Sequence, residues 1–365
     1  MTMANIRLTQ QQSIAYVTHL LTALKLPEQQ AAVVADHLTM AEMRGLASHG
    51  LSRIPFYTNK LKFGGYKADP SMCVLRQSAS SALIDADDAF GVVSGCYAMR
   101  MALDKARHTG CASVSVTHAN HIGFLAYYTM MAAQENMIGL AICNAGAATS
   151  IWGTSERVLG TNPLSVAVPA QRHWPVVFDA ATSVVAQGKV AVASIEGKPI
   201  PDNWAFDSAG RPTTSAQEAL KGAMRPFGDY KGSGLAMLIS LVSAGLNGVA
   251  FDMEPENLRR IKDSSAGSDL GDFFMAVDIS AFADVSLFKD RVDTFIELVK
   301  GFAPAPGFGE ILVPGEAEFR ASERAQRDGF TIGANLFGAL REIGMASGLA
   351  SEWDEWTVEG EGDVT

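Results

Sequence analysis

The first part of the chain carries hydrophobic residues at the spacing of an amphipathic helix. After Thr9, apolar residues recur every three or four positions, at Ile14, Val17, Leu21 and Leu24. This period predicts a helix, because residues three and four apart lie on one helical face. Thr9 with Gln12 three positions later forms the capping-box pattern that begins a helix.

Two further helices are predicted before residue 75. Pro27 is favoured in a first helical turn and Gly45 just past a last turn, so the second helix is predicted between them. A third is predicted over about 51–61. Residues 1–75 are therefore expected to form a helical layer, in which residues 48–50 make the turn between two helices.

Short apolar runs alternate with helical segments between residues 76 and 315. Strands are predicted at 82–85, 112–116, 138–143, 164–168, 176–179 and 273–279, and helices at 92–108, 124–135, 232–245 and 287–302. The first of these elements follow a β-α-β order, which predicts an α/β fold. Residues 188–214 contain several glycines and prolines and are predicted to be a long ordered loop.

The C-terminal part returns to helical spacing. Helices are predicted at 316–328 and 334–343, and they are expected to pack on the first three helices. The predicted organisation is a helical domain of residues 1–75 completed by 316–350, an α/β domain of residues 76–315, and a disordered acidic tail of residues 351–365.

Composition and charge restrict the function classes. The chain has 365 residues, of which 48% are hydrophobic and 19% charged, as is typical of a globular protein of one or two domains. The net charge is −10, and six acids without a base lie in the last fourteen residues. No cluster of Lys or Arg marks a surface for nucleic acid or for an anionic membrane.

Other features of the sequence predict a cytoplasmic protein. There is no signal-peptide pattern and no apolar run of membrane-spanning length. The cysteines form no C-x-x-C pair and are expected to be free thiols in a reducing compartment: Cys73, Cys96, Cys111 and Cys143.

The first candidate site surrounds His49, in the predicted turn Ser48-His49-Gly50. Arg53 and Tyr57 follow at positions four apart and share one helical face. An imidazole of near-neutral pKa beside a guanidinium can move a proton while the guanidinium holds a carboxylate. The alternative is a linker histidine that caps the preceding helix, with Arg53 in a surface ion pair.

The second candidate is His121, at the predicted change from strand to helix. Ligands in layered folds often bind at such an edge, although a buried structural histidine gives the same pattern. His118 and His121 form an H-x-x-H pair, and with Asp179 they could serve a metal-dependent hydrolase. That spacing has no fixed geometry in a turn, and no nearby Cys or Glu completes a ligand set, so no metal is predicted.

Polar and glycine-rich turns offer candidate cofactor contacts. Gly160-Thr161-Asn162-Pro163 and Asp179–Ser183 could line a cradle for ribose and phosphate, although Asn, Asp and Thr also bend chains routinely. Lys231-Gly232 opens a predicted helix, whose free N–H groups could bind an anion. No G-x-G-x-x-G follows a strand and no P-loop occurs, so a conventional Rossmann fingerprint is not supported.

Seven motifs in order resemble those of one family, from about Leu8 to Gly344. The family comprises the malate/L-lactate dehydrogenases that lack the usual dinucleotide fold, with ureidoglycolate, sulfolactate, diketogulonate and piperideine-carboxylate oxidoreductases. The motifs are Ser48-His49-Gly50 with Arg53 and Tyr57; Asn120-His121-Ile122-Gly123; Gly160–Pro163; Phe178–Ser183; Ile200-Pro201 with Trp204, Asp207, Gly210 and Pro212-Thr213; Lys231–Gly234; and Pro314-Gly315-Glu316.

The resemblance implies a homodimeric NAD- or NADP-dependent oxidoreductase with a non-Rossmann sheet domain and an active site near the subunit interface. It implies hydride transfer between the nicotinamide and C2 of a small 2-hydroxy or 2-oxo carboxylate, with reduction of a cyclic imine carboxylate as an alternative. Relatives differ over the acid/base residue: similarity to the ureidoglycolate enzyme favours His121, and similarity to the diketogulonate enzyme favours His49. Many relatives have Ser or His where Ala119 and Asn120 precede His121, which leaves substrate choice open.

The motif match assigns the remaining roles. The implied substrate-binding residues are Ser48, Arg53, Tyr57, Thr161 and Asn162. The implied cofactor-binding residues are Asp179, Ala180, Ala181, Thr182, Ser183, Lys231, Gly232, Pro314, Gly315 and Glu316.

Overall fold

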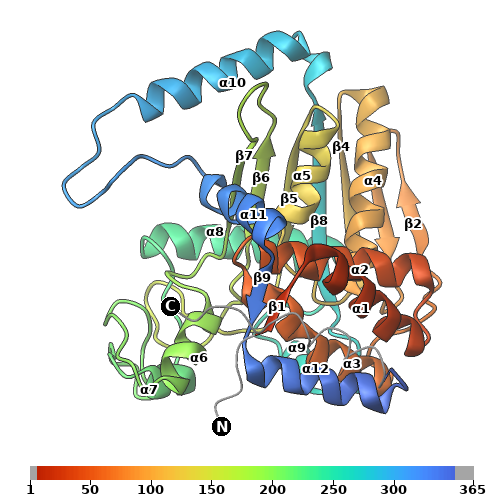
Figure 1. The fold of residues 1–365 in the computed structure, drawn as a ribbon, viewed down its shortest axis with the longest axis vertical. Helices are drawn as coiled ribbons and strands as arrows, with labels where there is room; N and C mark the ends of the chain where they lie inside the picture. The colour runs from red at the N-terminus through yellow and green to blue at the C-terminus, as the bar shows by residue number, and fades with distance from the viewer. Residues whose placement is uncertain (1–5, 350–365) are drawn as a thin grey trace.

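A seven-stranded mixed sheet forms the centre of the molecule in the computed structural model, which describes residues 6–349 (Figure 1). Its strand order is β2-β3-β4-β8-β5-β6-β7. The bounds are β2 (Cys73–Gln77), β3 (Ser81–Asp85), β4 (Cys111–Ala119), β5 (Met137–Cys143), β6 (Leu164–Val168), β7 (Val176–Ala180) and β8 (Leu270–Asp278). The prediction of an α/β fold is confirmed, and β2 is the strand of this sheet that the sequence patterns missed.

Strands β3 and β4 are parallel and are joined by α4 (Gly91–Thr109), as the β-α-β pattern predicts. Strand β8 pairs antiparallel with both β4 and β5 and so separates them. Helices α4 and α5 (Ala126–Gln134) cover one face, where Val114, Tyr128 and Phe274 are buried in a common core. This arrangement places the loop of residues 120–125, between β4 and α5, at the end of an internal strand of the sheet.

Segments from both chain ends form a helical layer. It contains α1 (Gln10–Ala23), α2 (Glu28–Met43), α3 (Ile54–Phe63), α11 (Glu316–Asp328) and α12 (Ala334–Ala346). Thr9 and Gln12 make the predicted capping box. The short strands β1 (Ile6–Leu8) and β9 (Phe330–Ile332) pair antiparallel, and side chains from α1, α3 and α12 share one core. The predicted acidic tail lies outside the described residues.

The third predicted helix differs from the prediction at its start. Residues 51–53 form a 3-10 turn, η2 (Leu51–Arg53), before α3 begins. Pro55 has no N–H to donate to the Leu51 carbonyl, so the Ile54 N–H takes that acceptor and the turn tightens.

The predicted loop over residues 188–214 is wrong at its beginning, where α6 (Gln187–Ile195) lies. Its last seven residues contain no glycine or proline, and the chain breakers gather after residue 196. Helices α7 (Ala216–Lys221) and α9 (Pro255–Lys262) were also not predicted. The remaining helices are α8 (Tyr230–Ser240), continued by the π-helical turn η3 (Leu241–Gly245), and α10 (Val285–Lys300), with 3-10 turns η1 (Ala47–His49) and η4 (Ile279–Ala281).

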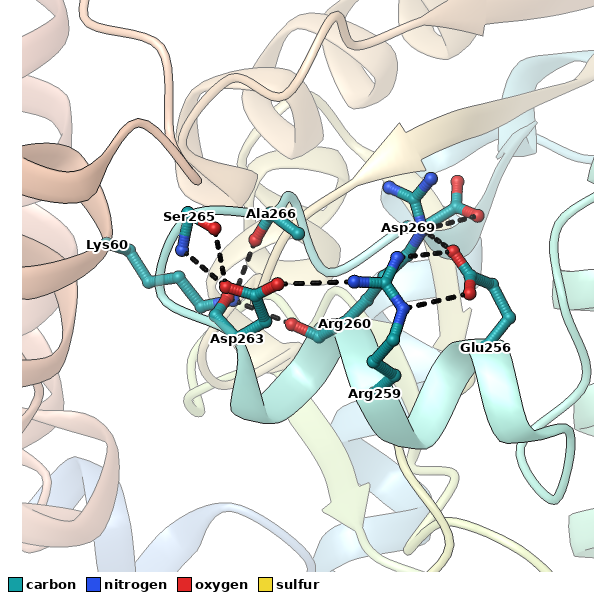
Figure 2. Close-up of polar contacts among 8 residues, drawn as sticks. All are labelled: Lys60, Glu256, Arg259, Arg260, Asp263, Ser265, Ala266 and Asp269. Atoms are coloured by element: carbon teal, nitrogen blue, oxygen red, sulfur yellow. Dashed lines mark hydrogen bonds and ion pairs between the residues drawn. The ribbon is translucent and has the colours of Figure 1, made fainter.

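Lys60 fastens the helical layer to the segment that leads into β8 (Figure 2). Its ammonium donates to the carbonyls of Arg260 (3.0 Å), Asp263 (2.8 Å) and Ala266 (2.9 Å), and the residue is only 1% exposed. Gly65 lies against the same segment, where an added Cβ would stand 2.5 Å from the Ser264 carbonyl oxygen. The three carbonyls satisfy a buried cation that would otherwise be costly. Among residues 6–349, no helix is long and apolar enough to cross a membrane.

Candidate active site

The turn between α2 and α3 presents His49 and Arg53. The Ser48 hydroxyl lies 3.0 Å from His49 Nδ1, and Arg53 Nε donates to the Ser48 carbonyl at 2.5 Å. No described residue accepts a hydrogen bond from the terminal amino groups of Arg53. The guanidinium is therefore held through one nitrogen, while the two that could grip a carboxylate remain free.

Glu42 holds this turn from inside. Its Oε1 accepts the Leu51 N–H at 2.8 Å, and an added Cβ on Gly50 would overlap the same carboxyl. Burial raises the pKa of Glu42 to about 7, against the lowering effect of the Leu51 N–H. Glycine at position 50 is thus required for the close approach that shapes the His49 turn.

His121 reaches the same place from the end of β4. Tyr57 from α3 contacts it, with 2.9 Å between the phenol oxygen and His121 Nδ1. The His49 and His121 rings face each other, with centroids 5.8 Å apart and planes inclined by 16°. The structure therefore brings together two histidines that lie 72 positions apart.

The backbone around His121 is fixed by buried polar contacts. The Asn120 amide donates to the carbonyls of Asp88 (3.0 Å) and Ala89 (2.9 Å), and its oxygen accepts the Ser268 N–H at 2.7 Å. Gly91 has no room for a side chain beside the Asn120 and His121 carbonyls. Asn120 thus positions His121 through the backbone, a role that its place in the sequence did not reveal.

Gly123, within this loop, packs directly against the His37 ring. Gly123 has a φ of +72°, and an added Cβ would overlap the His37 ring. His37 is fully buried and packs against Phe124 and Tyr127. Neither ring nitrogen has a hydrogen-bond partner in the described part of the chain. Burial, and then the nearby His49, lower the pKa of His37 to about 3, so its ring is neutral.

The two facing histidines are also neutral at pH 7. Burial and the charge of Arg53 lower the pKa of His49 to about 4. Burial, Arg53 and the other histidines lower the pKa of His121 well below its ordinary value. The expectation of near-neutral values is therefore wrong for the ligand-free protein, because desolvation penalises the imidazolium ion.

A cavity of about 1030 Å³ opens beside the histidines. Of the residues assigned by the motifs, its lining includes Ser48, His49, Arg53, His121, Thr161, Asp179, Ala180, Ala181, Pro314 and Gly315. This volume is at the upper end of the range that is typical of ligand-binding pockets, so the cavity can hold a dinucleotide and a small acid together.

Asp179 lies in this lining at the end of β7. Its Oδ2 accepts the Ala126 N–H at 2.7 Å, at the N-terminus of α5. Burial raises the pKa of Asp179 to about 6, despite the opposing effects of that N–H and of Arg44. Asp179 therefore caps a helix and contributes a carboxyl group to the cavity wall.

The other motif residues do not line the cavity in this chain. Tyr57 lies behind His121. The Asn162 side chain joins a buried network, donating to Asp252 at 2.6 Å and to the Ala236 carbonyl at 3.1 Å. Thr182 donates to the Thr161 carbonyl at 2.9 Å and Ser183 to the Val185 carbonyl at 2.9 Å.

Lys231, Gly232 and Glu316 also lie outside the lining. Lys231 and Gly232 occupy the first turn of α8. The Glu316 carboxylate accepts hydrogen bonds from Lys300 at 2.7 Å and from Arg320 at 2.5 Å. These contacts stabilise the first turn of α11.

Several lining residues were not predicted from the sequence. They are Arg44, Phe124, Gln187, Gly188, Lys189 and Glu318. Lys189 lies in the first turn of α6, a helix whose N-terminus has no side-chain cap. A helical reading of residues 187–195 would have pointed to Lys189, since a lysine in an uncapped first turn is typical of anion sites.

The alternative metal site does not form. His118 Nδ1 lies 3.0 Å from Asp85 Oδ1, and the side chain is half exposed. His118 itself has a φ of +50° and lies in the register shift of β4 between Val116 and Ala119. Within residues 6–349, no cluster of three His, Cys, Asp or Glu side chains could hold a metal ion. His118, His121 and Asp179 therefore do not form the metal-dependent hydrolase site.

Comparison with known proteins identifies one family and its fold. The malate/L-lactate dehydrogenase family matches residues 8–341. Malate dehydrogenase of Pyrococcus abyssi is 35% identical over 352 residues, which cover 94% of this chain and 96% of that protein. The structure of sulfolactate dehydrogenase from Methanocaldococcus jannaschii has a TM-score of 0.87 at 34% identity, covering 96% of this chain and 99% of that one.

Other relatives differ in cofactor and substrate. The NAD-dependent ureidoglycolate dehydrogenase of Escherichia coli is 32% identical, covering 86% of this chain and 88% of that protein. The NADP-dependent (2R)-3-sulfolactate dehydrogenase of Chromohalobacter salexigens is 35% identical, covering 72% and 78%. The structure of Δ1-piperideine-2-carboxylate reductase from Pseudomonas syringae has a TM-score of 0.83 at 26% identity, covering 92% of this chain and 99% of that one.

Proposed function

We infer that the cavity beside His49 and His121 is an active site for hydride transfer, because the chain belongs to the malate/L-lactate dehydrogenase family. The protein is an NAD(P)-dependent 2-hydroxy acid dehydrogenase and 2-oxo acid reductase. The observation that carries the assignment of the site is the pair of facing neutral imidazoles beside the free end of Arg53.

The lining fits a nicotinamide dinucleotide. The N-termini of α6 and α11 have no side-chain caps, and both meet the cavity. Lys189 and these N–H groups would hold phosphate, while Asp179, Ala180, Ala181, Pro314 and Gly315 would line the rest of the cofactor. The nicotinamide supplies or accepts the hydride. Thr182, Ser183 and Glu316 would act by shaping β7 and α11.

Arg53 would bind the substrate carboxylate through its two free amino groups. Because Arg53 Nε donates to the Ser48 carbonyl, the orientation of the guanidinium group is fixed and its two terminal amino groups remain for the carboxylate. Ser48, Thr161 and Asn162 would shape the same end of the cavity, and Tyr57 would orient His121.

A neutral imidazole can remove the hydroxyl proton as the hydride leaves C2, and the imidazolium returns that proton in the reverse direction. We propose that one of His49 and His121 transfers the proton and that the other hydrogen-bonds the substrate oxygen. The partners at Nδ1, Ser48 for His49 and Tyr57 for His121, would set which nitrogen carries hydrogen.

Replacing Arg53 by lysine tests the carboxylate contact. The variant keeps the positive charge but loses the planar fork, so kcat/KM for the 2-oxo acid is expected to fall about tenfold or more. The affinity for NAD(P)H should not change. Initial-rate kinetics with intact folding by circular dichroism measure this, and a wild-type kcat/KM would remove Arg53 from the substrate site.

The lowered histidine pKa values predict the pH dependence. The imidazoles gain a proton only well below pH 6.5, so kcat/KM for hydroxy acid oxidation should stay level down to about pH 6. Reduction requires the imidazolium ion, so its kcat/KM should fall about tenfold per pH unit above the lowered pKa.

NMR titration of the histidine rings in the ligand-free protein measures the same property directly. Because the charge of Arg53 lowers both pKa values, Arg53→Gln should move both titrations to higher pH. Ordinary titration near pH 6.5 in the wild-type protein would contradict the prediction.

A spectrophotometric screen at 340 nm tests the function and selects the substrate. Each cofactor would be paired with malate, lactate, sulfolactate, ureidoglycolate, diketogulonate and piperideine-2-carboxylate. Activity is expected with a 2-hydroxy or 2-oxo acid. The likeness to a piperideine-2-carboxylate reductase supports cyclic imine reduction as the second candidate, in which the same histidine would protonate nitrogen. Absence of nicotinamide-dependent turnover with every acid would contradict the assignment.

We propose that the protein is a homodimer with the active site near the interface. Large apolar side chains are exposed on α8 with η3, and on α10 with the loop after it, which reach beyond the sheet (Figure 1). They are Tyr230, Met237, Leu238, Leu241, Phe295, Leu298, Phe302 and Phe308. Lys231 and Gly232, in the first turn of α8, would reach the cofactor at this interface.

Leu238→Glu tests the interface, because it places a charge on its apolar surface. Sedimentation equilibrium should show a wild-type dimer and a variant that is largely monomeric, with lower activity. The matched control is Leu75→Glu, because Leu75 on β2 is exposed and lies outside the proposed interface. A buried leucine such as Leu21 would not serve, since a charge there would unfold the protein. A monomeric wild-type protein would exclude the proposed dimer.

We also propose that residues 1–75 with 316–350 form the helical domain, and residues 76–315 the cofactor domain. Unpaired Cys73, Cys96, Cys111 and Cys143 support a reducing, cytoplasmic location. Fractionation of cells that express the protein tests the location, and recovery outside the cytoplasmic fraction would contradict it.

A further inference from the structure

Arg44, at the C-terminal end of α2, is a buried cation in the cavity wall. It is 4% exposed and lines the cavity. Its guanidinium lies over the Phe319 ring at 4.5 Å, and Phe319 stacks on Trp174 with centroids 5.8 Å apart and planes 5° from parallel. Two aromatic layers therefore hold the guanidinium in one orientation.

Within residues 6–349 this guanidinium has no hydrogen-bond acceptor. No described residue forms a hydrogen bond or close ion pair with its side chain, and the Nε atom is buried without a partner. Burial lowers the pKa of Arg44, while Glu318 and Asp179 act in the opposite direction from a longer range. A buried cation with unused donors is destabilising unless an anion joins it.

The first turn of α11 adjoins the same place. Gly315, with a φ of +87°, is the N-cap and offers no side chain to the helix, and Phe319 lies one turn further on. The N–H groups of Ala317 and Glu318 have no acceptor among the described residues. Unused N–H groups at a helix N-terminus and a fixed guanidinium together are typical of a phosphate site.

We propose that Arg44 and the N-terminus of α11 bind a phosphate group of the nicotinamide dinucleotide. This inference rests on the proposed function and names a residue that no sequence motif assigned. Arg53 already offers its fork to the substrate carboxylate at the histidine end of the cavity. The α11 N-terminus and Arg44 therefore match the other anion of the reaction, the phosphate of the cofactor. Glu318 faces this site and would repel phosphate, so its side chain must point away when the anion binds.

Arg44→Met is the decisive variant, because methionine keeps an unbranched apolar stem over Phe319 and removes the charge. Calorimetry with ADP-ribose should show a dissociation constant raised about tenfold or more, since a charge-assisted contact is lost. Arg44→Lys should recover part of the affinity. With 2′-phospho-ADP-ribose as a second probe, a loss confined to that ligand would place the 2′-phosphate at Arg44, and an equal loss with both would place the diphosphate there.

Thermal unfolding separates this role from a structural one. Removal of an unpaired buried charge should leave the melting temperature of the ligand-free protein unchanged or higher. The matched control is Arg53→Met. This variant should bind the 2-oxo acid more weakly and should bind ADP-ribose like the wild type. The inference is overturned if Arg44→Met binds both ADP-ribose and 2′-phospho-ADP-ribose like the wild type, or loses cofactor and substrate affinity together with a lower melting temperature. Failure of the wild-type protein to bind NAD, NADP or either ADP-ribose probe would instead contradict the proposed function.

Discussion

Alanine in place of His49 or His121 is expected to lower kcat about 100-fold or more for the residue that transfers the proton. In the proposed mechanism the second histidine hydrogen-bonds the substrate oxygen, so its loss should chiefly lower kcat/KM. The two rings lie with centroids 5.8 Å apart, and both residues line the same cavity. Rates would be measured from pH 5 to 9 on proteins whose folding has been checked. If both variants keep a near-wild-type kcat, the proposed active site is wrong.

Two milder variants identify the proton-transfer residue. Tyr57→Phe removes the partner of His121 Nδ1, and Ser48→Ala removes the partner of His49 Nδ1. Each variant keeps the imidazole but removes the hydrogen bond that selects its tautomer and fixes its ring orientation. The variant that lowers kcat and shifts its pH dependence marks the proton-transfer histidine, whereas a change in KM alone marks the orienting one. The comparison is matched, because each variant deletes one hydroxyl group.

Gly123→Ala is expected to destabilise the protein by about 2–5 kcal/mol, the sum of a left-handed backbone penalty and of overpacking against His37. The position has a φ of +72°, and the new methyl group would overlap the buried His37 ring. This cost is a large part of the stability of a typical protein. Urea unfolding measures the change, and activity should fall as well because the loop also carries His121.

A double variant separates the two causes. Gly123→Ala with His37→Ala makes room for the methyl group but retains the unfavourable backbone angle. The double-mutant cycle should therefore show a favourable coupling on the order of 1–3 kcal/mol between the two substitutions. Additive effects would mean that the ring moves aside freely and that the contact does not determine the loop geometry.

Much of the fold was predictable because its helices and strands have clear periods. Residues 316–328, for example, were predicted to be helical at the bounds that α11 has. Helix α6 was missed because the glycines and prolines after residue 196 led to the prediction of a loop for the whole segment 188–214. The prediction for residue 51 failed for a local reason, since Pro55 removes a donor that a regular helix needs there.

The candidate site was predictable only where chemistry is concentrated in short motifs. His49, Arg53 and His121 were found in this way, but their mutual distances depend on how the helical layer meets the sheet. Arg44 belongs to no distinctive motif and becomes a candidate only when Phe319, 275 positions later, is seen beneath it. The lowered pKa of His121 was also missed, because burial is a property of the folded chain.

The position of β8 has a consequence for how the protein is made. During synthesis both β4 and β5 are complete by residue 143, which is 135 residues before the strand that separates them ends at residue 278. Until then each of the two strands exposes an unpaired edge, which is prone to association with other chains. Pairing across such a separation is slow to form. Nascent chains that end before residue 270 are therefore expected to depend on chaperones, and completion of β8 is the step that closes the sheet.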